Sequence, residues 1–194
     1  MAEIRAMCVY CGSQTGVEPA HAALARGLGR ALASRDIELV FGGGAVGLMG
    51  VLADAALGAG GRVTGVIPHF LEQPEIAHPG VTRMIVVDSM HARKQRMFEA
   101  ADAFAALPGG LGTLDETVEM ITWRLLGLHD KPVVLIDHRG YWRPLLALVE
   151  HMIAAGFARA SVRDLCTIVE SVDGLFDALA ARPAPHLAAD SERL

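Results

Sequence analysis

The sequence has little cysteine, no long basic run and no long apolar run, and each absence excludes a class of protein. Three cysteines among 194 residues (Cys8, Cys11 and Cys166) are typical of a reduced, cytoplasmic protein rather than a disulfide framework. The 17 basic residues are outnumbered by 22 acidic ones and form no run that would bind a nucleic-acid backbone. No stretch of about 18 uncharged apolar residues occurs, so we predict no membrane span.

Signals for secretion and for metal binding are missing as well. Residues 1–5 lead directly into an apolar segment without the h-region of a signal peptide, which again favours a cytoplasmic protein. The eight histidines show no H-x-x-x-H or comparable spacing, so we predict no metal, structural or catalytic, and no cofactor. Cys8 and Cys11 form a C-x-x-C, but Cys8 lies inside the apolar segment and no second pair completes a zinc site. We interpret both as small buried residues.

Short apolar segments alternate with segments of helical periodicity along the whole chain. We predict strands at residues 6–10, 37–41, 61–67, 81–87, 103–107, 132–136 and 166–169, and helices at residues 19–34, 47–57, 89–101, 117–126, 141–155 and 172–181. This alternation is typical of an α/β protein. The predicted fold is a three-layer, doubly wound, Rossmann-like domain over residues 1–181 with a parallel sheet of about seven strands. We expect residues 182–194 to form a flexible tail.

The most informative stretch runs from Leu107 to Glu116, L-P-G-G-L-G-T-L-D-E. Its glycines lie between a predicted strand and a predicted helix, where they let the backbone approach a ligand and where free N–H groups favour a phosphate. Asp115 and Glu116 place carboxylates beside this phosphate position, which a site for bond cleavage would need and a site for phosphate alone would not. A capping box from Thr113 to Glu116 is the structural alternative.

Two further stretches follow predicted strands and would share the same sheet edge. Residues 42–47 match G-x-G-x-x-G, but the next strand ends at Pro68 without the acidic residue of a dinucleotide site, so we do not expect NAD to bind. Arg93, Lys94 and Arg96 lie in the first turns of the helix from residue 89. They form either a solvated face paired with Glu99 or Asp102, or a group in which Arg93 points into the crevice.

The chain resembles the LOG (Lonely Guy) family. The resemblance covers residues 6–157 and rests on P-G-G-x-G-T-x-x-E at residues 108–116, M-H-x-R-K at residues 90–94, and the segments 11–13, 42–50, 121–123 and 129–132. It implies an enzyme that hydrolyses cytokinin riboside 5′-monophosphates, and AMP as well, to the free base and ribose 5-phosphate. Members were long labelled lysine decarboxylases, but no recognisable pyridoxal-phosphate lysine motif is present. The resemblance also implies a homodimer with sites near the subunit interface.

The resemblance assigns roles to particular residues. Glu116 is the expected catalytic carboxylate, Arg93 the residue that fixes the substrate and assists departure of the base, and Gly110, Gly112 and Thr113 the phosphate contacts. The full predicted substrate-binding set is Glu75, Arg93, Lys94, Gly109, Gly110, Leu111, Gly112, Thr113, Leu114, Asp115, Glu116 and Thr122. Glu75 would otherwise be a lone surface carboxylate.

Two alternatives to this hydrolase remain open at this stage. One is a non-catalytic nucleotide or cofactor carrier of the same fold, similar to molybdenum-cofactor carriers, which would have no need for Arg93 and Glu116 together. The other is an NAD-dependent oxidoreductase. Leu111 and Asp115 depart from residues common in plant members of the family, so the base preference is also open.

Overall fold

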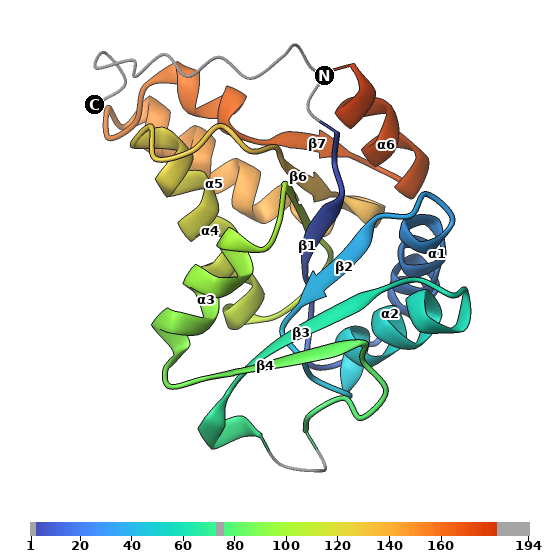
Figure 1. The fold of residues 1–194 in the computed structure, drawn as a ribbon. Helices are drawn as coiled ribbons and strands as arrows, with labels where there is room; N and C mark the ends of the chain where they lie inside the picture. Colours follow the sequence, from blue (N-terminus) through green and yellow to red (C-terminus); the bar gives the residue numbers. More distant parts are fainter. Residues whose placement is uncertain (1–2, 73–75, 182–194) are drawn as a thin grey trace.

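A seven-stranded parallel sheet forms the centre of the protein in the computed structural model, which describes residues 3–72 and 76–181 (Figure 1). The strand order is β4-β3-β2-β1-β5-β6-β7, and every pairing is parallel. The strands are β1 (Ala6–Tyr10), β2 (Glu38–Phe41), β3 (Val63–Pro68), β4 (Arg83–Val87), β5 (Ala103–Ala106), β6 (Val133–Ile136) and β7 (Thr167–Val169). The predicted doubly wound α/β fold is therefore confirmed.

Helices cover both faces of the sheet. The helices α1 (Pro19–Ala33), α2 (Gly47–Gly58) and α6 (Val172–Ala180) lie on one face, and α3 (Met90–Glu99), α4 (Leu111–Leu125) and α5 (Arg143–Ala154) lie on the other (Figure 1). Short 3₁₀ turns occupy His69–Leu71, His138–Gly140 and Ala160–Leu165. Within the described residues, no helix combines the length and the apolar character that crossing a bilayer requires.

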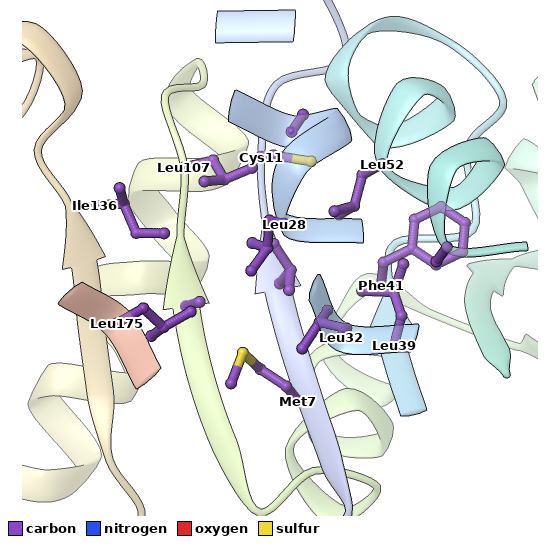
Figure 2. Packing of buried hydrophobic residues seen from close by; sticks show 14 of the residues in the cluster. Met7, Cys11, Leu28, Leu32, Leu39, Phe41, Leu52, Leu107, Ile136 and Leu175 are labelled. Atoms are coloured by element: carbon purple, nitrogen blue, oxygen red, sulfur yellow. The ribbon is translucent and has the colours of Figure 1, made fainter. Parts of the chain in front are cut away.

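Two apolar cores result, because successive side chains of a strand point to opposite faces. On β1, Met7 and Val9 join the core under α1, α2 and α6, whereas Cys8 and Tyr10 join the core under α3 and α4. Figure 2 shows the first core, in which Leu28 and Leu52 of the two helices lie close to Met7 and Phe41 of the strands.

The C-x-x-C consists of buried small residues, as the sequence indicates. Cys8 and Cys11 are both buried. Burial raises the pKa of each thiol. The two cysteines therefore stay protonated and are poor nucleophiles and poor metal ligands at neutral pH.

Most element boundaries lie within one or two residues of the prediction, but the start of α4 does not. The predicted helix began at residue 117, whereas α4 begins at Leu111 with Gly110 as its N-cap. The capping box is therefore wrong, because Thr113 lies inside the first turn and Glu116 is buried rather than folded back to cap it. Gly110 is extended, and no side chain caps the first turn of α4.

The chain reverses its direction of travel across the sheet between β1 and β5. From β1 the strands proceed outward to β4, and α3 then returns the chain to the other side of β1. The loops after β1 and β5 meet there, where the Gly12 N–H donates to the Pro108 carbonyl at 3.1 Å. Ligands of doubly wound folds bind at such a switch point, beyond the carboxyl ends of the strands.

Candidate active site

A buried ion pair joins α3 to α4 at this sheet edge. Arg93 Nη1 donates to Glu116 Oε1 at 2.7 Å, and the two residues are only 8% and 7% exposed. The remaining donors of the guanidinium face backbone carbonyls, because Nε donates to Val66 at 3.1 Å and Nη2 to Gly42 at 3.4 Å. A buried charge needs such partners, since it has lost its water.

Gly42, the first glycine of the G-x-G-x-x-G segment, leaves the space that the Arg93 guanidinium occupies. A Cβ at Gly42 would collide with Nη2 of Arg93, so no other residue fits without moving the guanidinium. The following residues pair with a distant segment, because Ala45 N–H donates to Ile76 O at 2.7 Å and His78 N–H to Gly43 O at 2.9 Å. These bonds fix the turn whose Gly42 carbonyl accepts from Arg93.

The environment of Glu116 favours its protonated form more than water does. Burial raises the pKa of this carboxyl group above its ordinary value, although the ion pair with Arg93 opposes the rise and the neighbouring Asp115 adds to it. A carboxylate held in this way is more basic than a solvated one. It can accept a proton from water, or stabilise positive charge that develops nearby in a place with few competing water molecules.

The glycine loop and the first turn of α4 present N–H groups to the same crevice. The carbonyls of Pro108 and Gly110 accept from the N–H groups of Gly12 and Leu114, respectively. Within the described residues, nothing accepts a hydrogen bond from the N–H groups of residues 110–113. Four free donors at the positive end of a 15-residue helix form a site that suits a phosphate.

Lys94 and its neighbours form a second polar group beside the pair. Lys94 Nζ lies 3.1 Å from carboxylate oxygens of both Asp115 and Glu119. Burial lowers the pKa of Lys94, but its hydrogen bonds to the two carboxylates outweigh that effect and raise the pKa overall. Glu119 was missed from the sequence, although its spacing of four residues from Asp115 places both carboxylates on one helix face.

Of the three cations of α3, only Arg96 belongs to a solvated face; the side chains of Arg93 and Lys94 are largely buried. Arg96 pairs with Glu99 at 3.2 Å, as the alternative of a solvated face predicted. Arg93 instead points inward, and Asp102 accepts from the backbone N–H groups of Arg5 and Ala6 rather than from any of the three cations.

The other predicted residues lie around this centre at different depths. Thr113 is buried against Gly109, where a Cβ on the glycine would collide with the threonine hydroxyl. The outer face of α4 contains a shallow hollow of about 580 Å³, lined by Leu111, Leu114, Asp115, Val118, Glu119, Thr122 and Trp123. Thr122 is therefore on the outer face of α4, in a hollow whose lining does not include Glu116. Glu75 lies outside the described residues.

No metal centre accompanies these groups in the described part of the chain. There, histidine, cysteine, aspartate and glutamate side chains nowhere gather in threes or more in a way that would hold a metal ion.

The backbone partners of Arg93 could not be predicted from the sequence. Any residue type can supply a carbonyl such as that of Val66, so no sequence signal identifies it.

Comparison with known proteins identifies the family of the chain. A family model described as "Possible lysine decarboxylase" matches residues 49–179. The cytokinin riboside 5′-monophosphate phosphoribohydrolase of Rhodococcoides fascians is 46% identical over 176 residues, which are 90% of this chain and 89% of that protein. This chain belongs to the LOG family. Plant members include the phosphoribohydrolase LOG1 of Arabidopsis thaliana, which is 42% identical over 173 residues, 89% of this chain and 81% of that protein.

Further comparisons give the same family and the same fold. The probable phosphoribohydrolase LOGL1 of Oryza sativa subsp. japonica is 49% identical over 159 residues, 82% of this chain and 71% of that protein. Membership of the LOG family confirms the prediction of an enzyme. A molybdenum-cofactor binding protein of Rippkaea orientalis superposes with a TM-score of 0.69 over 93% of this LOG-family chain and 98% of its own, but at 21% identity, which establishes the fold alone.

Proposed function

We propose that this LOG-family chain hydrolyses the N-glycosidic bond of nucleoside 5′-monophosphates. The substrates would be N6-substituted AMP of the cytokinin type and AMP itself, and the products the free base and ribose 5-phosphate. The observation that carries the proposal is the buried Arg93–Glu116 pair beside the free N–H groups of the α4 N-terminus. This combination offers a holder for phosphate and a carboxylate next to it.

The proposed mechanism follows from charge. The N–H groups of residues 110–113 would bind the 5′-phosphate and so place the ribose over Glu116. Breaking the N-glycosidic bond leaves positive charge on the sugar, which the carboxylate would stabilise. The base departs with a proton taken from solvent, and water then adds to the anomeric carbon and gives up a proton to Glu116 or to solvent. Arg93 would hold Glu116 in place and contact the substrate.

The remaining predicted contacts belong to this proposal as well. Lys94 and Asp115 would line the approach to the site, and Thr122 the outer face of α4. Glu75 keeps its predicted role as a substrate contact.

A carrier of the same fold is not favoured. A carrier requires only the phosphate-holding N–H groups, whereas a buried ion pair costs several kcal/mol in desolvation for each ion before its attraction is counted. An enzyme that breaks a bond needs the buried pair, so the hydrolase accounts for this cost and the carrier does not.

The outer face of α4 supports a homodimer with sites near the interface. Leu111 is 85% exposed and Val118 is 40% exposed, and both border the hollow of this face. Apolar side chains gathered in this way are typical of an interaction surface. Because Glu116 belongs to the same helix, a partner seated there would lie next to the proposed site.

The test is release of free base from AMP and from isopentenyladenosine monophosphate, measured by chromatography for the wild type and for Glu116→Gln. We expect the wild type to release base and ribose 5-phosphate, and the variant to lose about 10²–10³ in kcat or more. Glu99→Gln, an exposed change on α3, is the matched control and should retain full activity. Equal rates for Glu116→Gln and wild type would refute the assigned carboxylate.

A further inference from the structure

The turn after β6 brings a tyrosine to the phosphate end of the crevice. Arg139 and Gly140 both have positive φ, and the Asp137 carboxylate accepts from the Trp142 N–H at 2.6 Å, so the chain reverses sharply. Tyr141 then projects over the sheet edge. Its ring is held edge-on by His21 of α1, with centroids 5.8 Å apart, and by Trp142, with centroids 5.2 Å apart.

The hydroxyl of Tyr141 donates a hydrogen bond to the Gly109 carbonyl. This bond completes a series, because the carbonyls of Pro108 and Gly110 on either side already accept from Gly12 and Leu114. Three successive carbonyls of the loop are thus drawn toward protein donors. The loop cannot turn a carbonyl toward the crevice without breaking one of these bonds.

The carbonyl of Gly109 and the N–H of Gly110 belong to one planar trans peptide group, in which they point in opposite directions. Holding the carbonyl toward Tyr141 therefore aims the Gly110 N–H away from Tyr141. Rotation of this peptide would replace a donor with a partially negative oxygen at the place of the phosphate. Glycine at 109 and 110 makes such a rotation easy, since neither residue has a Cβ to resist it.

We propose that Tyr141 is a positioning residue for phosphate binding, which acts by fixing the orientation of the Gly109–Gly110 peptide. This inference rests on the function proposed above and deepens it, because it assigns the turn after β6 to the phosphate end of the site. Tyr141 touches neither the reacting bond nor Glu116 and acts through the loop. Its ring contacts with His21 and Trp142 are separate from the hydroxyl, so the two contributions can be measured apart.

The experiment compares Tyr141→Phe with wild type by calorimetric titration with ribose 5-phosphate and with adenine. The phenylalanine ring retains the packing and loses only the hydroxyl. We expect the dissociation constant for ribose 5-phosphate to rise about three- to tenfold, the cost of one hydrogen bond. Adenine affinity should stay unchanged, and the melting temperature should fall by only a few degrees, because the ring contacts remain. In turnover of AMP, KM should rise by a similar factor while kcat changes less than about twofold.

The other outcomes are decisive in the opposite direction. Unchanged affinity for ribose 5-phosphate, whatever the melting temperature, would show that Tyr141 is merely structural. Weaker binding of ribose 5-phosphate and adenine alike would also overturn a role confined to the phosphate. If the wild type binds ribose 5-phosphate, loses affinity in the variant and yet cleaves no nucleotide, the proposed hydrolysis fails while the positioning role stands. No binding of ribose 5-phosphate by the wild type would overturn both.

Discussion

At the scale of single residues, the buried carboxyl of Glu116 makes stability depend on pH in an unusual direction. Its pKa is raised in the folded protein, above the ordinary value of 4.5 that it regains on unfolding. Between these two values the folded state binds more protons than the unfolded state, so stability falls as pH rises through that window. Above the raised pKa the loss is complete and stays constant. Most paired carboxylates show the opposite sign.

This effect predicts a difference between wild type and Glu116→Gln, because the amide does not titrate. In urea unfolding without ligand, the free energy of unfolding of wild type minus that of the variant should decrease as pH rises above 4.5 and then level off. The slope within the window is at most about 1.4 kcal/mol per pH unit. If the free-energy difference instead increases with pH, the attraction of Arg93 outweighs burial and the pKa of Glu116 is lowered.

At the scale of elements, two glycines of α1 experience different neighbours although they are two positions apart. A Cβ at Gly29 would collide with the Leu52 carbonyl of α2 and lie 3.0 Å from Ala56 N, whereas a Cβ at Gly27 would meet only a Val172 methyl at 4.0 Å. Gly29 thus lets the two helices approach closely (Figure 1). Gly27 only weakens the helix.

Alanine at the two positions should therefore change stability in opposite directions. Gly27→Ala should raise the free energy of unfolding by up to about 1 kcal/mol through helix propensity. Gly29→Ala gains the same helix propensity but forces α1 away from α2. It should therefore lower the free energy of unfolding by about 1–3 kcal/mol. Urea unfolding of both variants measures the difference. Equal stabilisation by both would show that the helices yield without cost.

The elements show which features a sequence can and cannot predict. Apolar periodicity identified the seven strands and six α-helices of the described residues, because burial imposes a period of two or 3.6 on the side chains. It misplaced the start of α4, since the glycines at 109, 110 and 112 indicate a turn, whereas the helix already begins at Leu111. The motif named Arg93 and Glu116 but could not show that they touch, because their contact depends on α3 and α4 meeting across 23 positions of sequence.

At the scale of the whole molecule, the proposed homodimer through α4 can be tested by a substitution at Val118. Glutamate there should weaken the dimer by about tenfold or more, because a charge would enter an apolar interface beside the carboxylates of Asp115 and Glu119. Glutamate forms helix better than valine, so α4 itself should not suffer. Sedimentation velocity over a concentration series measures the dissociation constant, and a molecular mass that Val118→Glu leaves unchanged would contradict an interface on this face.

The matched control is Leu148→Glu on α5, which exchanges another half-exposed apolar helix residue for the same charge. Leu148 is 48% exposed against 40% for Val118, so the two changes cost similar solvation in a monomer. We expect Leu148→Glu to remain dimeric. Dissociation by Leu148→Glu alone would move the interface to α5, away from the helix that carries Glu116. In that case each subunit would have to complete its site from its own residues, and a monomer would be as active as the dimer.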